Sequence, residues 1–225
     1  MAICSGCFVT IPRPPSLNHP ICAFALDGTH TGPQNLGLVA TPLKHDAQAI
    51  NQAIERVASA IARRHAQTDR LLLLGIANGG IALTARLADR LKQVGLKPGT
   101  GTIDISFHRD DIGRNPIPKE FSPTIIPHDV NGATVILVDD VLYSGRTVKA
   151  ALDELFDHGR PTRVELAVLV DRGGRRLPVA AEYIGLTVAA TEGQKVVVTL
   201  DEKLSAADSV AVLPANSPSS RALAS

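Results

Sequence analysis

The sequence has few aromatic residues and no tryptophan: aromatic side chains make up 3% of its 225 residues. Proteins that bind single-stranded nucleic acid without sequence preference stack bases on exposed aromatic rings, so this composition argues against such a platform. The formal net charge is only +1, which does not indicate a globally basic nucleic-acid binder. A basic patch confined to one face of the protein is still compatible with this charge.

Cysteines and long apolar runs are also scarce. All three cysteines, Cys4, Cys7 and Cys22, precede residue 45. Cys4 and Cys7 form one C-x-x-C pair without a second pair of metal ligands, which disfavours a zinc site. A cysteine-free body suits a reducing cytoplasm. Because no apolar run is long enough to span a bilayer and no secretory signal is evident, we expect a cytoplasmic protein that does not contact a membrane.

The chain is expected to hold one domain with an extension at each end. Residues 1–44 carry Pro, Gly, His and Thr without a sustained period, so we expect a poorly ordered N-terminal extension. Residues 45–203 contain regular apolar patterns typical of a folded domain. Residues 204–225 are rich in Ala, Ser and Pro, which predicts a disordered tail.

Helical and strand patterns alternate through residues 45–203. A helix is predicted after Asp46, because Ile50, Ile54, Val57 and Ile61 fall on one helical face. The predicted strands are 71–77, 102–107, 134–138, 164–170, 182–188 and 195–200, and the further helices are 81–94 and 147–158. This alternation predicts an α/β fold with an open, mostly parallel sheet flanked by helices. Residues 108–130 contain four prolines and no period, which is typical of a functional lid loop.

The segment Val138–Thr147 carries the chemistry of a binding site, at the carboxyl end of a buried strand. Two carboxylates, Asp139 and Asp140, come first, and carboxylates accept hydrogen bonds from sugar hydroxyls. A turn with Gly145 and two hydroxyl side chains then leads into a helix, whose N-terminus is an anion site. A ligand with a diol and a phosphate, such as ribose 5-phosphate, satisfies both features. The alternative is a solvated Asp-Asp loop followed by a simple turn.

This segment resembles the fingerprint for 5-phosphoribosyl-1-pyrophosphate (PRPP) in type I phosphoribosyltransferases. Within them the chain is similar to the bifunctional pyrimidine-operon attenuation regulators and uracil phosphoribosyltransferases. The supporting stretches are His108–Asp111, Leu166–Gly173 and Arg176–Val179, and the likeness covers about residues 45–200. Purine-salvage members carry an Asp near the base where this chain has Tyr143, which argues against a 6-oxopurine substrate. The resemblance implies the type I phosphoribosyltransferase fold, with a small hood over the base and a flexible lid loop.

The resemblance also assigns roles to residues. Asp139 and Asp140 would bind the ribose hydroxyls and stabilise the positive charge that develops on the sugar, and Arg109 in the lid would contact pyrophosphate. Many members have Thr-Arg-Gly where this chain has Asn78-Gly79-Gly80, so the arginine is missing from the pyrophosphate loop. The implied sites are as follows: PRPP-binding, Asp139, Asp140, Val141, Leu142, Tyr143, Ser144, Gly145, Arg146 and Thr147; pyrophosphate loop, Asn78, Gly79 and Gly80; lid, Arg109, Asp110 and Asp111; base-binding, Val170, Asp171 and Arg172 under the hood at 170–178.

The implied activity is the transfer of ribose 5-phosphate from PRPP to uracil, giving UMP and pyrophosphate, in a homodimer. Mg²⁺ is expected as a cofactor bound mainly through PRPP, without dedicated protein ligands. Binding to pyrimidine-operon leader mRNA is the second implied function. A nucleotide-sensing RNA-binding regulator with little or no catalysis, and a phosphoribosyltransferase for another base, are the alternatives. Five arginines could form a basic face for RNA, although such runs are usually solvated surface: Arg160, Arg163, Arg172, Arg175 and Arg176.

Overall fold

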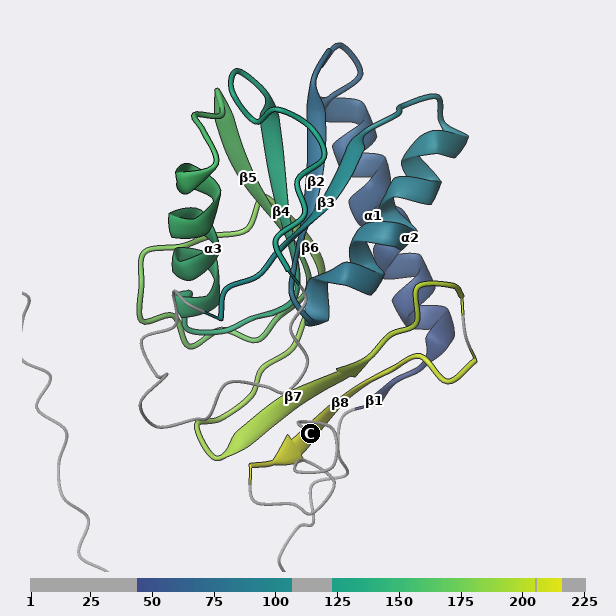
Figure 1. Cartoon of the computed structure of the whole chain (residues 1–225). Coiled ribbons are helices and arrows are strands. Elements are labelled where there is room, and N and C mark those ends of the chain that lie inside the picture. The colour runs from purple at the N-terminus through teal and green to yellow at the C-terminus, as the bar shows by residue number, and fades with distance from the viewer. Residues whose placement is uncertain (1–43, 107–122, 205, 216–225) are drawn as a thin grey trace, which may run out of the picture. The chain divides into compact units, whose positions relative to one another are not determined.

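The computed structural model describes residues 44–106, 123–204 and 206–215, all within the compact unit formed by residues 40–225. These ranges contain three helices and eight strands, which form two sheets (Figure 1). In chain order the elements are β1 (Lys44–His45), α1 (Ala47–Arg64), β2 (Leu71–Ile76), α2 (Gly79–Gln93), β3 (Gly99–Ile103), β4 (Thr134–Leu142), α3 (Arg146–Asp157), β5 (Arg163–Asp171), β6 (Tyr183–Thr187), β7 (Gln194–Thr199) and β8 (Ser209–Pro214). No helix in these ranges is both long and apolar enough to cross a membrane.

The larger sheet has five parallel strands in the order β3-β2-β4-β5-β6. α1 and α2 cover one face and α3 covers the other (Figure 1). Both faces are therefore buried, which explains why β2 is apolar at every position but one glycine. Leu73 packs in the cluster with α1 and α2, whereas its neighbour Leu74 packs in the cluster with α3. This arrangement confirms the predicted α/β fold.

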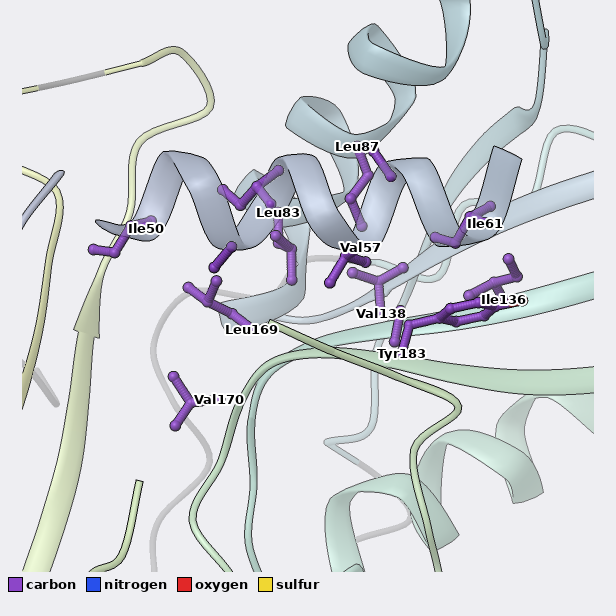
Figure 2. Close-up of a cluster of buried hydrophobic side chains, with 14 of the residues drawn as sticks. Ile50, Val57, Ile61, Leu83, Leu87, Ile136, Val138, Leu169, Val170 and Tyr183 are labelled. Carbon is purple, nitrogen blue, oxygen red and sulfur yellow. The ribbon is translucent and has the colours of Figure 1, made fainter. Parts of the chain in front are cut away.

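α1 forms where the sequence predicts it, because its first turn is capped and one face is apolar. The Asp46 side chain accepts a hydrogen bond from the Ala49 backbone N–H at 2.9 Å. Ile50, Ile54 and Ile61 are completely buried in the cluster that also holds side chains of α2 and the sheet. Figure 2 labels Ile50 and Ile61 of this face. Burying one such side chain stabilises the fold by about 1.5–3 kcal/mol. Removing this apolar face would therefore detach α1 from the sheet.

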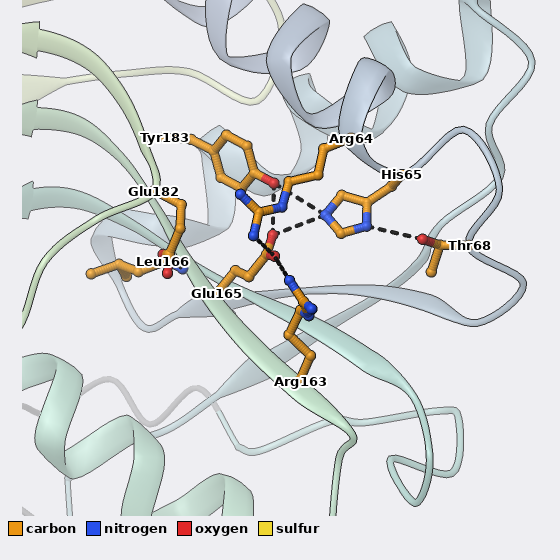
Figure 3. Close-up of polar contacts among 8 residues, drawn as sticks. All are labelled: Arg64, His65, Thr68, Arg163, Glu165, Leu166, Glu182 and Tyr183. Carbon is orange, nitrogen blue, oxygen red and sulfur yellow. Dashed lines mark hydrogen bonds and ion pairs between the residues drawn. The ribbon is translucent and has the colours of Figure 1, made fainter.

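A buried polar cluster joins the end of α1 to the starts of β5 and β6 (Figure 3). Glu165 accepts hydrogen bonds from the Tyr183 hydroxyl at 2.6 Å and from His65 Nε2 at 2.9 Å, and pairs with Arg64 Nη2 at 3.0 Å. His65 Nδ1 lies 3.0 Å from Thr68 Oγ1. Burial by itself raises the pKa of Glu165, but its hydrogen bonds and the positive charges beside it lower that pKa overall. The cluster fixes the amino edge of the sheet, opposite the carboxyl ends of the strands.

The second sheet is antiparallel, with strand order β1-β8-β7, and lies beyond the carboxyl ends of the parallel strands (Figure 1). Asp208, directly before β8, links the second sheet to α2 on the larger sheet: its Oδ2 lies 2.5 Å from Arg86 Nη1 in an ion pair. Both side chains are at most 3% exposed. The hood was expected at residues 170–178, but in the structure this second sheet is the small layer, and residues 172–178 form an irregular loop after β5.

The prediction that a disordered tail begins at residue 204 is wrong for Ser209–Pro214, which form β8. This strand pairs with β7 from Ser209 to Pro214 and with β1 at Val210 and Ala211. Val210 and Val212 are buried, so the strand does have the alternation of a half-buried strand. The many small and polar residues around it hid that short period, and one of its two partners, β1, is distant in sequence.

The second predicted strand, 102–107, is displaced: the strand in the structure is β3, which spans Gly99–Ile103. Its two glycines carry no apolar signal, and its register is set by parallel pairing with β2. The next residues leave the sheet, where the Asp104 carboxylate accepts hydrogen bonds from the Ser106 backbone N–H and hydroxyl. Most of the predicted lid at 108–130, namely residues 108–122, lies outside the described residues. Residues 123–130 are irregular apart from an isolated bridge between Ile125 and Thr102.

Candidate active site

Asp139 and Asp140 lie inside β4, which continues four residues beyond the predicted end at Val138. Asp139 is paired opposite Val168 of β5 and is only 6% exposed. Its Oδ1 accepts a hydrogen bond from the Asp140 backbone N–H at 3.0 Å. Successive side chains of a strand point to opposite faces of the sheet, so the side chains of these two neighbouring residues leave the backbone in opposite directions. The structure thus places both predicted acids at the carboxyl edge of the central strand.

The electrostatics of this pair favour a ligand that brings positive charge or hydroxyl groups. Burial raises the pKa of Asp139 well above its usual value, and the charge of Asp140 raises it further. Burial also raises the pKa of Asp140, although hydrogen bonds and the positive charge of Lys195 on β7 partly offset this. Two ionised carboxylates are therefore costly in the free protein. Lys195 was not predicted as a site residue, because only the packing of β7 near β4 brings it close.

The predicted phosphate cradle is a tight turn between β4 and α3. Gly145 adopts φ +91° and is the N-cap of α3. This left-handed conformation favours glycine, and a Cβ there would lie 3.2 Å from Leu177 Cβ. The Arg146 backbone N–H points back to Ser144 Oγ at 3.3 Å. Arg146 and Thr147 are exposed in the first turn of α3, where an anion would meet the helix N-terminus.

The predicted pyrophosphate loop forms the corresponding turn between β2 and α2. The peptide bond between Ala77 and Asn78 is cis, and Asn78 is the N-cap of α2. A Cβ on Gly80 would lie 2.0 Å from the Val138 carbonyl oxygen, so this position requires glycine. A Cβ on Gly79 would lie 2.5 Å from Asp140 Cγ. Because glycine stands in place of that arginine, the start of α2 lies closer to β4 than a side chain at position 79 would allow.

The arginines of the segment that follows β5 make hydrogen bonds, an ion pair and a ring contact within the protein. Arg172 is only 8% exposed, and its guanidinium carbon lies 3.9 Å from the centroid of the Tyr143 ring. Its Nη2 donates to the Thr191 carbonyl at 3.2 Å. Arg175 Nη2 donates to Asp171 Oδ2 at 2.6 Å. Arg172 is buried, so the predicted basic surface is wrong for this residue, and the side chain of Arg175 is only 23% exposed.

The remaining predicted site residues separate into two groups. Val170 is completely buried in the hydrophobic core, so its side chain does not line the site, whereas Asp171 and Arg172 lie at the carboxyl edge beside the phosphate cradle. Arg109, Asp110 and Asp111 lie outside the described residues. The contact of Arg109 with pyrophosphate therefore stays a prediction.

A five-stranded parallel sheet, with paired acids on its central strand and glycine turns entering two helices, is the arrangement of a phosphoribosyltransferase. The model of the phosphoribosyl transferase domain matches residues 45–203. The bifunctional protein PyrR of Bacillus subtilis (strain 168) is 46% identical over 162 residues, which cover 70% of this chain and 88% of that protein. PyrR of Roseiflexus sp. (strain RS-1) is 43% identical over 75% of this chain and 92% of its own length. The chain belongs to the PyrR family of phosphoribosyltransferases.

Solved structures support the fold at lower sequence identity. The hypoxanthine phosphoribosyltransferase of Trypanosoma cruzi is similar with a TM-score of 0.57 and 22% identity, covering 75% of this chain and 94% of that one. A hypoxanthine-guanine phosphoribosyltransferase of Bacillus anthracis has a TM-score of 0.55 at 18% identity, covering 76% and 99%. These likenesses confirm the type I phosphoribosyltransferase fold and carry no information on the base.

Proposed function

We propose that this protein is a uracil phosphoribosyltransferase, which converts uracil and PRPP to UMP and pyrophosphate. The observation that carries the proposal is the pair of buried Asp139 and half-buried Asp140, flanked by the N-termini of α2 and α3. PRPP has a matching order of groups: a pyrophosphate, a diol and a 5′-phosphate. Helix N-termini favour the two phosphate ends, and carboxylates favour the diol. The likeness to PyrR proteins supports uracil as the base.

The reaction transfers the ribose 5-phosphate from a leaving group, pyrophosphate, to an attacking group, uracil. The bond from C1 of the ribose to a pyrophosphate oxygen breaks, a bond to N1 of uracil forms, and that nitrogen loses its proton. Positive charge develops on the sugar ring as pyrophosphate departs. Asp139 and Asp140 stabilise that charge when ionised, and their partly buried position strengthens the effect.

Mg²⁺ belongs to this proposal as the cofactor that accompanies PRPP. Its hard, oxygen-seeking character suits the pyrophosphate oxygens and the carboxylates of Asp139 and Asp140. A cation bound beside Asp139 and Asp140 would favour the ionised form of both carboxyl groups, whose pKa is raised without it. When bound, the ion neutralises charge on the departing pyrophosphate.

Replacing Asp140 by Asn tests the enzymatic assignment. The variant keeps the shape of the side chain but loses its charge, so we expect the rate to fall at least about tenfold, or ~1.4 kcal/mol of transition-state stabilisation. The measurement is uracil-dependent release of pyrophosphate from PRPP. Asp153→Asn, at a half-exposed position on α3, is the matched control. Unchanged pyrophosphate release in Asp140→Asn contradicts the proposal.

Binding to pyrimidine-operon leader mRNA is the second proposed function, supported by the likeness to relatives named bifunctional. Arg163 and Arg176 have side chains 56% and 58% exposed and could contact phosphates, unlike Arg172 and Arg175. Filter binding with leader RNA, with and without UMP, tests this function. Specific binding survives competitor RNA, and the salt slope counts the phosphate contacts. A homodimer in the cytoplasm is proposed from the family resemblance.

A transferase for another small heterocycle is the remaining candidate. Purified protein incubated with PRPP and a panel of bases distinguishes it from a uracil enzyme. Pyrophosphate release with uracil alone supports the main proposal. Release with a different base transfers the assignment to that base, and release with none leaves the RNA-binding regulator.

A further inference from the structure

The predicted phosphate cradle, the turn between β4 and α3 at residues 142–147, is held in place by the loop that links β5 and β6. We call it the phosphate turn. The main-chain carbonyl groups of residues 142–144 all accept hydrogen bonds from residues 172–177 of that loop. The main-chain donors are Arg172 N to the Leu142 oxygen at 3.2 Å, and Arg176 N and Leu177 N to the Ser144 oxygen at 3.0 Å each. The turn is therefore fixed through its backbone, by a segment 30 residues or so further along the chain.

Arg175 supplies the side-chain part of this support. Its Nη1 donates to the Tyr143 carbonyl at 2.8 Å and to the Leu142 carbonyl at 3.2 Å. Its Nε donates to the Val179 carbonyl at 3.2 Å, within its own loop. One guanidinium group thus bonds to both segments at once, which its planar fork of donors permits and a lysine ammonium does not reproduce.

Asp171 orients Arg175. Its Oδ2 accepts from Arg175 Nη2 at 2.6 Å, while its Oδ1 accepts from the Gly173 backbone N–H at 2.8 Å. Both carboxylate oxygens are thus engaged within the loop. The side chains of Arg175 and Asp171 are 23% and 19% exposed, so solvent screens the pair only in part. This geometry gives Asp171 a supporting role in place of the predicted contact with the base.

We infer that Arg175, oriented by Asp171, is a positioning residue that holds residues 142–147 in the conformation that binds the 5′-phosphate. A phosphate turn binds well when its N–H groups are already aimed at the ligand, because ordering them costs nothing on binding. The inference rests on the proposed function, since it takes this turn as the ribose 5-phosphate site. In this inference Arg175 acts through the turn and not through a contact with the base or the sugar.

Replacing Arg175 by Leu tests the inference through the affinity for phosphate-bearing ligands. We expect the Kd for UMP, measured by calorimetry, and the KM for PRPP to rise at least about tenfold, while kcat and the KM for uracil change less than about threefold. Arg175→Lys should recover part of the loss, because it retains the charge opposite Asp171. The matched control is Arg176→Leu, whose side chain is 58% exposed and pairs only with the exposed Glu192 in the described part of the chain.

Amide hydrogen exchange of the ligand-free protein gives a second, independent readout. In Arg175→Leu the amides of residues 143–147 should exchange at least about tenfold faster, while those of α1 keep their protection. An unchanged Kd for UMP, unchanged exchange in the turn, or an equal rise in the KM for PRPP and for uracil overturns the inference. A wild-type protein that binds UMP but transfers no ribose to uracil overturns the proposed activity and leaves the inference standing.

Discussion

Gly79 allows the start of α2 to approach Asp140 more closely than a residue with a Cβ could while the carboxylate keeps its position. In Gly79→Ala the new methyl group would lie 2.5 Å from Asp140 Cγ. The carboxylate is the end of a flexible side chain, so we expect it to rotate away while the fold survives. The expected result is an almost unchanged Tm and a kcat/KM for PRPP that is about tenfold lower, or ~1.4 kcal/mol.

Gly193→Ala is the matched control for this variant, because a Cβ at Gly193 would meet no atom within 4 Å. Steady-state kinetics and thermal unfolding of both variants separate a displaced carboxylate from general damage. A kcat/KM for Gly79→Ala equal to that of the wild type would show that the position of Asp140 does not depend on this close approach.

The positions of single residues were predictable where neighbours along the chain define the local structure. Asp139, Asp140 and Gly145 lie in one strand-turn-helix unit, as predicted. Their roles as a diol and a phosphate site stay a prediction. The role of Arg175 was not predictable, because its partners at Leu142 and Tyr143 lie 33 and 32 residues away. The same holds for Glu165 and His65, which are 100 residues apart.

At the level of elements, the ion pair that ties β8 to α2 predicts a large loss of stability when one partner is removed. Asp208→Asn leaves the Arg86 charge buried and uncompensated, and its Nε and Nη2 already have no hydrogen-bond partner in the described part of the chain. We expect the free energy of unfolding to fall by about 3–5 kcal/mol. Urea denaturation measures it.

The double variant Arg86→Met, Asp208→Leu is the control for this prediction. It removes both charges and keeps apolar volume, so it should lose far less stability than Asp208→Asn. If the double variant is as unstable as the single one, the pair acts through packing rather than through compensated charge.

Elements were predictable in proportion to their periodicity. α1, β2 and β4 have long apolar patterns and appear where expected, with β4 longer than predicted. β3 and β8 did not stand out, because glycine and alanine give no clear period and because their registers depend on strands elsewhere in the chain. β7 was predicted as a strand at 195–200, but its pairing with β8 and β1 in a second sheet could not be predicted from local sequence.

For the whole molecule, the raised pKa of Asp139 predicts that its carboxyl group lowers the free energy of unfolding of the ligand-free protein at neutral pH. A carboxyl group whose pKa is higher in the folded state contributes stability below its ordinary pKa of about 4, and loses it as the pH rises through the folded value. Asp139→Asn removes this loss. We expect the variant to be more stable than the wild type at neutral pH, with a difference that shrinks towards pH 4.

Denaturant titrations at pH 4 and pH 7.5 measure that difference. Asp153→Asn serves again as the control and should show no pH-dependent gain. Comparing variant with wild type also cancels the contribution of Glu165, whose lowered pKa acts in the opposite direction: its stability is present at neutral pH and is lost in acid. Equal stabilities of Asp139→Asn and wild type at neutral pH would contradict the prediction.

The described fold begins and finishes in the same small sheet, since Lys44 of β1 is paired with Ala211 of β8. The two ends of the domain are thus neighbours, and a circular permutant with these ends joined and a new opening in an exposed turn would preserve every strand pairing. Cutting the chain at residue 203, where the family match ends, is different. It would remove β8, the middle strand of that sheet, and would leave the buried Arg86 of α2 without its counter-ion Asp208.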